Sequence, residues 1–207
     1  MAAPSVTNIV HTGAWLYNAP VGEANPDETT VAYGAAWGGN WVRVGYTKAP
    51  LTLAYESEES DVTVEEELPP VKRFRISENL TVETVLAELT AEYLQLAAAN
   101  QTAVTSTAAG VGQKAYEYTS LGGDAVMTER KWGFEWRHIP ADGTPQPGRA
   151  FIHRGTAMIN GNLEFSQKAD DYPGVPIQVK ALSDTAQSAG AKLVRFERVT
   201  AAATYYA

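Results

Sequence analysis

One alternating stretch near the middle of the chain constrains the fold most. Leu51, Leu53 and Tyr55 alternate with smaller or polar residues, and a second run places Val62 and Val64 opposite polar neighbours. A period of two is typical of a strand with one buried face and one wet face. The wet face and the turn between the runs are acidic, and the residues concerned are Glu56, Glu58, Glu59, Asp61, Glu65, Glu66 and Glu67. The stretch therefore predicts a long hairpin or loop with an acidic, solvated side.

The charge reverses after the double proline Pro69-Pro70, where Lys72, Arg73 and Arg75 follow with Phe74 among them. Basic residues beside an aromatic ring are one way to contact nucleic acid. The acidic run next to them in sequence favours a charge-complementary contact between copies instead. An ordinary solvated surface remains the third interpretation.

Two hydrophobic periods compete over residues 79–100. Leu80, Val82, Thr84 and Leu86 fit a strand, while the residues after them fit a helix. Thr90 is suited to cap the helix. We predict a strand to about Glu88 and a helix over residues 91–99.

The remaining pattern predicts short strands separated by turns. Strands are expected at residues 14–20, 29–37, 41–47, 125–139, 149–159, 163–168, 175–184 and 192–199. Residues 101–124 are predicted to be loop with one weak strand, and Gly38-Gly39 to be turn glycines. Without an internal repeat or a linker, the sequence predicts one β-rich domain, 1–207, with a single helix.

The composition excludes several kinds of chemistry. The 207 residues include no cysteine, which excludes disulfides, Cys-based metal sites and a thiol nucleophile. A net charge of −8 argues against a tight grip on phosphate backbones. The chain begins without a signal-peptide pattern and carries no apolar run of about 20 residues. We expect a soluble protein with no membrane contact, assembled in a reducing cytoplasm.

No segment has the pattern of an active site. His11, His138 and His153 lack metal-ligand spacing, although the last two could face each other across a hairpin. Trp15, Trp37 and Trp41 could stack on a sugar, but aromatic residues at strand spacing are usually core. The acids form a contiguous run, and no GxSxG motif is present. We predict no enzyme activity, no cofactor and no metal.

The order of segments carries a resemblance. Residues 71–94, VKRFRISENLTVETVLAELTAEYL, run as a strand through a glutamate into a short helix. Residues 149–184 form a hairpin that ends in a proline-flanked strand and Leu-x-Asp. Over roughly residues 30–200 the chain resembles the major tail tube proteins of long, non-contractile-tailed bacteriophages.

The resemblance implies a two-sheet antiparallel β-sandwich with one flanking short helix and a long hairpin loop. It also implies hexameric rings that stack into a virion tail tube, through which DNA passes without specific binding. Tape measure, terminator and distal tail proteins would be further partners. The loop, about residues 56–75, would contribute to contacts between rings, and residues 1–28 and 198–207 would be terminal arms.

Strand parity then makes Glu56, Glu58, Glu65 and Glu67 the best candidates for the lumen or the loop. A lumen lined by carboxylates would repel the phosphate backbone, so DNA would slide. Two alternatives stay open: another virion component, such as a decoration or tail terminator protein, and a carbohydrate-binding β-sandwich that uses the tryptophans.

Overall fold

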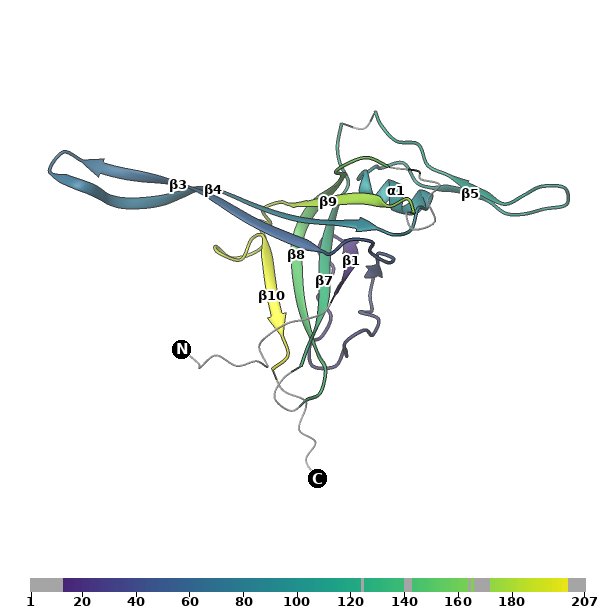
Figure 1. Ribbon diagram of the computed structural model, residues 1–207, viewed down its shortest axis with the longest axis horizontal. Coiled ribbons are helices and arrows are strands. Elements are labelled where there is room, and N and C mark those ends of the chain that lie inside the picture. The colour runs from purple at the N-terminus through teal and green to yellow at the C-terminus, as the bar shows by residue number, and fades with distance from the viewer. Residues whose placement is uncertain (1–12, 124, 140–142, 164, 166–171, 201–207) are drawn as a thin grey trace, which may run out of the picture.

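Antiparallel strands and one short helix make up the described part of the chain, which is residues 13–123, 125–139, 143–163, 165 and 172–200 of the computed structural model. Figure 1 shows their arrangement. The elements are β1 (Ala14–Pro20), β2 (Val42–Arg43), β3 (Thr52–Val64), β4 (Glu67–Leu86), α1 (Ala91–Ala97), β5 (Thr105–Thr107), β6 (Tyr116–Tyr118), β7 (Glu129–His138), β8 (Gln146–Ile159), β9 (Val175–Ala181) and β10 (Val194–Arg198).

The main sheet has the strand order β2-β1-β7-β8-β9-β4-β3 and folds into two layers at β8. The first half of β8 pairs with β10, and its second half pairs with β9. In Figure 1, β3, β4 and β9 run across the view while β7, β8 and β10 run down it. The predicted antiparallel β-sandwich with one helix is therefore confirmed, with its two layers joined through β8.

The core lies between these layers and is built by alternation along the strands. Trp132 and Phe134 of β7 are buried against Leu80 and Val82 of β4 and Ile177 of β9. Trp136 packs at the edge of the same cluster. The expected aromatic face of β7 is thus confirmed, because every second residue of a strand points to the same side.

The helix begins where the sequence predicts. Thr90 has extended backbone angles, and its Oγ1 accepts a 3.1 Å hydrogen bond from the backbone N–H of Tyr93. Glu92 lies in the first turn, where its negative charge interacts favourably with the positive end of the helix dipole. The helix ends at Ala97, two residues earlier than predicted, and Ala97 is buried against the core.

The strand predicted for residues 29–37 is wrong. This segment folds into turns that a buried ion pair secures. Arg149 donates hydrogen bonds of 2.8 Å to the Val31 carbonyl and 3.4 Å to the Ala32 carbonyl, and Glu135 accepts one of 3.0 Å from the Gly34 N–H. These side chains satisfy backbone groups that a neighbouring strand would otherwise pair.

Three other strand predictions also change. Only Val42–Arg43 of residues 41–47 is a strand. Leu163 and Phe165 lie outside any strand, and the rest of residues 163–168 falls outside the described residues. Residues 101–124, predicted as loop with one weak strand, contain β5 and β6, which pair as a separate two-stranded sheet.

The predicted terminal arms are only partly described. Residues 14–20 form β1, which pairs with β7 inside the sheet, so these residues are not an arm. Arg198 is the last residue of β10, rather than the first of an arm. Residues 1–12 and 201–207 lie outside the described residues.

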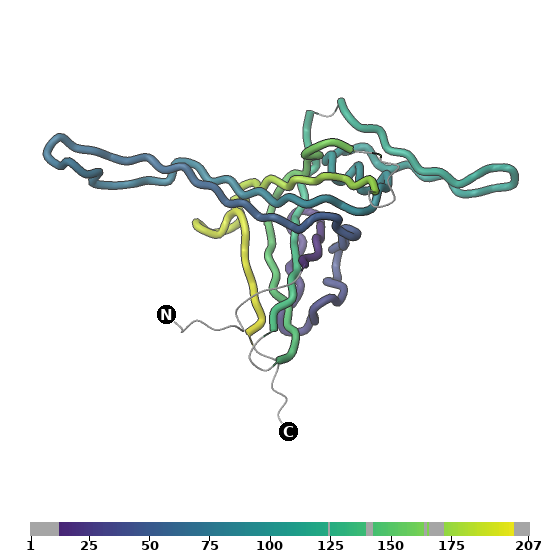
Figure 2. Tube along the Cα trace, viewed as in Figure 1, coloured from purple at the N-terminus to yellow at the C-terminus, as the bar shows by residue number. Residues whose placement is uncertain are grey.

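Two hairpins project from the sandwich in opposite directions, as the trace in Figure 2 shows. One is formed by the outer parts of β3 and β4, and the other contains β5 and β6. The core lies in the sandwich between them, so the two hairpins extend beyond the packed body of the protein.

Candidate assembly surfaces

The first projecting hairpin is the acidic arm, defined as residues 56–79 of β3, β4 and their turn. Every residue of β4 from Glu67 to Asn79 is exposed, and burial begins only at Leu80. The turn lies at Glu65 and Glu66, so residues 52–64 are one strand rather than two runs. Pro69-Pro70 lies inside β4, where the register is irregular because proline cannot donate to the ladder.

One side of the arm, the polar outer face, carries Glu56 and Glu58. Directly opposite them in the register are Asn79 and Ser77, and the Ser77 hydroxyl donates a 3.0 Å hydrogen bond to Glu58 Oε2. The same face continues across the layer through Glu83, Gln178 and Lys180, and its members are Thr52, Glu56, Glu58, Thr81, Glu83, Thr156, Gln178 and Lys180. This face points away from the core.

The other side of the arm, the ion-paired face, carries Glu59 and Asp61. Arg73 lies opposite Asp61 and donates to its Oδ1 at 2.6 Å, and it also lies 3.5 Å from Glu59. The hydrogen bond from Arg73 holds the pKa of Asp61 below its usual value. Arg75 pairs with Glu78 in the same way, and its hydrogen bond holds the pKa of Glu78 below its usual value. Arg73 and Arg75 are therefore paired inside their own hairpin.

A β-bulge at Ile76 shifts the register of the arm, while the acids of β3 divide between its two faces by simple alternation. The register shifts between Glu58 and Glu59, so Ser77 faces Glu58 and Arg75 faces Glu59. One extra residue on β4 changes which of its side chains point to each side beyond that position. Of the predicted lumen residues, Glu56 and Glu58 share a face, Glu65 and Glu66 lie in the turn, and Glu67 begins β4 opposite Val64.

The outer part of the arm also exposes apolar side chains. On the face continuous with Glu58, Val62 and Phe74 follow beyond the bulge, and the Lys72 ammonium lies 4.7 Å from the centre of the Phe74 ring. The exposed apolar residues of the arm are Val62, Val64, Leu68, Val71, Phe74 and Ile76. Isolated two-stranded hairpins are marginally stable in water, so such an arm gains stability from a partner surface.

The edge of the main sheet beside the arm is open. β3 is the last strand in the sheet order, and β4 is its only partner among the strands that the structure describes. Along its 13 residues, the backbone N–H and C=O groups that do not point to β4 are available to a neighbouring strand. Sequence parity predicted a strand here but could not show that it lies at an edge.

A buried ion network holds the segment before β2 against the sheet, and sequence reasoning missed it. Arg149 and Glu135 are both 0% exposed and lie 2.9 Å apart, and Arg149 also contacts Glu28 at 2.8 Å. Burial raises the pKa of Glu28 to about 7, and a hydrogen bond with Glu197 acts in the same direction. The network therefore places a carboxyl with a raised pKa beside the buried pair of Arg149 and Glu135.

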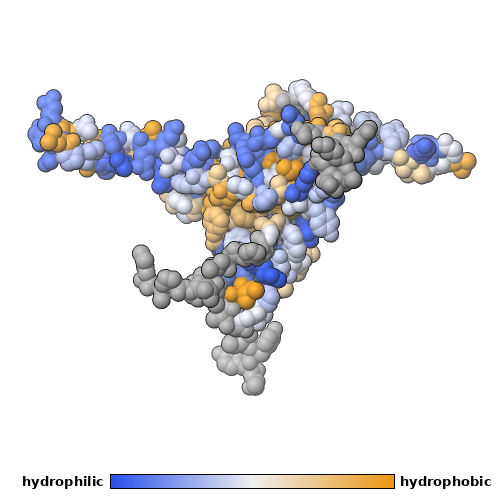
Figure 3. All heavy atoms as spheres, viewed as in Figure 1, coloured by the Kyte–Doolittle hydropathy of each residue, from blue (hydrophilic) through white to orange (hydrophobic). Residues whose placement is uncertain are grey.

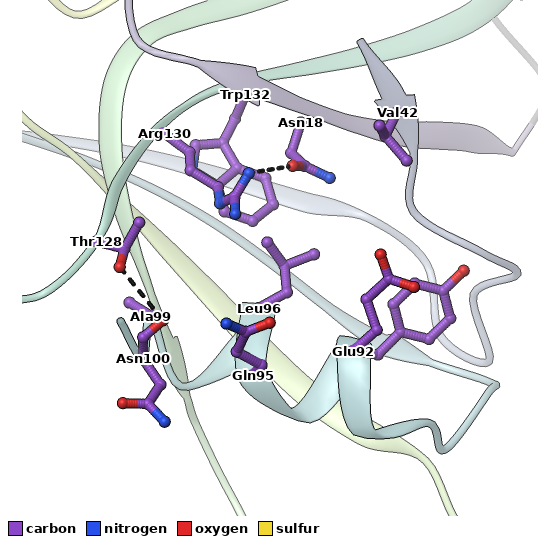
Figure 4. Close-up of a pocket in the computed structure, with 11 residues that line it drawn as sticks. Asn18, Val42, Glu92, Gln95, Leu96, Ala99, Asn100, Thr128, Arg130 and Trp132 are labelled. Carbon is purple, nitrogen blue, oxygen red and sulfur yellow. Dashed lines mark hydrogen bonds between the residues drawn. The ribbon is translucent and has the colours of Figure 1, made fainter. Parts of the chain in front are cut away.

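The recess between α1 and strands β1 and β7 has a volume of about 110 Å³. Figure 4 shows Asn18, Trp132 and Leu96 around it, with Arg130 donating a 3.1 Å hydrogen bond to the Asn18 side chain. Pockets that hold drug-sized molecules measure roughly 300–1,000 Å³. A few water molecules fit this recess, which makes it a packing feature between the helix and the sheet.

The tryptophans and histidines lie in packed positions. Trp37 is buried against Tyr17 and Phe151, with ring centres 3.9 Å and 5.4 Å away, and Trp15 stacks on Tyr33. These contacts use the ring faces that a sugar would need. His138 lies opposite Gln146, not His153, so the two histidines do not face each other.

Among the residues that the structure describes, no group of three or more His, Asp or Glu side chains could hold a metal ion. The same residues include no helix that is long and apolar enough to cross a membrane.

Comparison with known proteins identifies the family to which the chain belongs. A family model described as phage tail tube protein matches residues 1–203. A search of curated proteins finds no match. The match spans the sandwich, the acidic arm, α1 and β10. The chain therefore belongs to the phage tail tube protein family, and it is a structural component of the virion tail that assembles with other tail proteins as a multimer.

Proposed function

We propose that six copies of this protein form a ring, that rings stack into the tail tube, and that the tube conducts phage DNA into the host. The open edge of β3 beside the polar outer face is the observation that carries this proposal. Tape measure, terminator and distal tail proteins would meet the interior and the ends of the tube, which would assemble in the host cytoplasm.

Ring closure is supported by the backbone groups along β3. An open edge of this length invites pairing with another chain, and a closed ring of copies uses those hydrogen bonds while leaving no edge exposed. Glutamates on the strand disfavour uncontrolled pairing, since like charges on identical strands repel. We therefore assign β3 to the contact with the neighbouring copy in the ring.

The lumen assignment rests on the polar outer face. Glu56, Glu58 and Glu83 lie on this face without an ion pair among the interactions of the described residues, whereas the acids of the opposite face are paired with arginine. Six copies would multiply the uncompensated carboxylates around a channel. A wall of carboxylates repels phosphates, so DNA would slide through the channel without binding specifically to it.

Negative-stain electron microscopy of concentrated purified protein tests the assembly directly. We expect rings of six copies and stacked tubes. A uniform monomer at every concentration would contradict the proposal. Rings without tubes would contradict the stacking step and favour a terminator-like role.

A further inference from the structure

We propose that the hairpin containing β5 and β6 is a second assembly arm, and that it docks on the outer part of the acidic arm of a neighbouring copy. This inference rests on the proposed ring or tube, because it needs a second copy of the chain as the partner. The hairpin, residues 101–123, is named the neutral arm below.

The neutral arm has the composition of a contact surface. Its 23 residues carry only two charged side chains, Lys114 and Glu117. Its apolar and aromatic members are exposed, and Val111 at the tip, Tyr116, Tyr118 and Leu121 belong to this set. The centres of interfaces are typically depleted of charge and enriched in tyrosine.

The register places the two tyrosines on one side of the arm. Tyr116 pairs with Thr107, and Tyr118 pairs with Thr105, so two stacked phenol rings and two threonines share a face. The ring centres lie 6.3 Å apart. The charged Glu117 lies on the opposite face with Ser106. The arm therefore presents one uncharged face to a partner.

The root of the neutral arm is anchored to the sandwich, which gives the tip a defined direction. Glu117 accepts a 3.2 Å hydrogen bond from the Ala91 N–H at the start of α1. The Asn100 side chain donates to the Ser120 carbonyl, and Gln101 Nε2 donates a 2.8 Å hydrogen bond to the Val126 carbonyl. Beyond these contacts the arm extends away from the body of the protein (Figure 1).

The acidic arm of another copy is the partner that fits. The two arms project from opposite ends of the molecule, and Figure 3 shows apolar atoms near both ends. A head-to-tail contact in a ring joins opposite ends of neighbouring copies. The acidic arm offers Val62, Val64, Leu68 and Phe74 as exposed apolar groups. Burying them against the tyrosine face removes apolar area from water on both arms.

Charge decides against contacts between two acidic arms. Residues 56–79 contain eight acidic and three basic side chains, so two acidic arms repel each other. The neutral arm carries one charge of each sign and lies beside the acidic arm without repulsion. Lys114 near its tip adds a weak attraction for the glutamates at the turn, Glu65 and Glu66.

Cysteine cross-linking tests this contact, and the natural absence of cysteine leaves a clean background. Leu68 and Val111 have relative exposures of 101% and 109%, so Leu68→Cys and Val111→Cys leave the packing of the monomer intact. The double variant is assembled, checked for tubes by microscopy, and treated with oxidant or with a flexible bis-maleimide. Denaturing gels then show the products.

A head-to-tail contact predicts a ladder of cross-linked oligomers from the double variant. An equal mixture of the two single variants should give heterodimers and nothing larger, and each single variant alone should stay monomeric on the gel. Tubes that give no ladder with either reagent would overturn the docking while leaving the proposed tube standing. A dimer from Val111→Cys alone would overturn it too, since the neutral arms would then meet each other. Protein that forms neither tubes nor a ladder would refute both proposals.

Discussion

Arg73 and Asp61 lie directly opposite each other in the hairpin of β3 and β4, with Arg73 Nε 2.6 Å from Asp61 Oδ1. Of the three basic residues predicted to contact another copy, Arg73 and Arg75 are ion-paired within their own hairpin, and Lys72 lies over the ring of Phe74. This pairing keeps one face of the acidic arm close to neutral, while the other face keeps its carboxylates uncompensated.

Arg73→Ala should leave the melting temperature of the monomer unchanged, because the pair is exposed. It should slow assembly at low salt, since Glu59 and Asp61 then repel neighbouring copies, and added salt should restore the rate. Lys72→Ala is the matched control, with the same change in charge on the other face. Light scattering during assembly measures both variants. An equal response of the two would mean that net charge, rather than the pairing, governs assembly.

Glu135→Gln should destabilise the fold strongly. Arg149 and Glu135 are both fully buried, and removing one partner of a buried pair typically costs about 3–5 kcal/mol. Chemical denaturation measures the free energy of unfolding. Glu129→Gln, in the partly exposed pair with Arg154, is the control and should change that free energy far less. Similar losses in the two variants would contradict the structural role assigned to the buried pair.

Glu28 should make stability fall as pH rises. Its pKa is raised from 4.5 to about 7 in the folded protein by burial and by the hydrogen bond with Glu197. Between these two values the folded state binds more protons than the unfolded state, so the free energy of unfolding decreases with rising pH. The contribution of the protonated carboxyl is complete below about pH 4.5 and lost above about pH 7.

Denaturation curves of wild type and Glu28→Gln at several pH values isolate this effect. Other titrating groups contribute to both proteins, so the difference between the two curves reports Glu28. As pH rises through this range, the free energy of unfolding of the wild type should fall relative to that of Glu28→Gln. A difference that stays constant with pH would show that Glu28 titrates normally.

The double charge reversal Glu56→Lys/Glu58→Lys should preserve tubes and impair DNA delivery. Two added positive charges per copy would attract phosphates to the channel wall and slow the passage of DNA, with infectivity falling about tenfold or more. Glu65→Lys/Glu66→Lys makes the same change in the turn, away from the polar outer face. Plaque counts with normal tubes in both variants test the assignment, and equal infectivity would remove Glu56 and Glu58 from the lumen.

Local sequence rules predicted the parts of the fold that depend on neighbouring residues alone. The alternation in β7 gave its buried aromatic face, and Thr90 marked the start of α1. The bulge at Ile76 could not be predicted, because no glycine or proline marks it and only the pairing of β3 with β4 creates it. Glu58 and Glu59 lie on opposite faces by alternation along β3, whereas the bulge places Arg73 and Arg75 on the face of Glu59 and Asp61.

Long-range contacts account for the other differences. The turns at residues 31–34 depend on Arg149 and Glu135, which lie more than 100 residues further along the chain. The run of Val, Ala and Tyr in that segment has the composition of a strand. Its backbone groups instead form hydrogen bonds with the side chains of the buried ion pair. The second arm was also missed, since β5 and β6 are three residues each and lie in a segment rich in small and turn residues.

A cryo-electron microscopy map of the assembled tube would show which strand and which face each copy presents to its neighbours. We expect β3 within hydrogen-bonding distance of a strand from the neighbouring copy, with Glu56 and Glu58 facing the channel. A tube whose channel is lined by another face, with β3 edges exposed to solvent, would contradict this expectation.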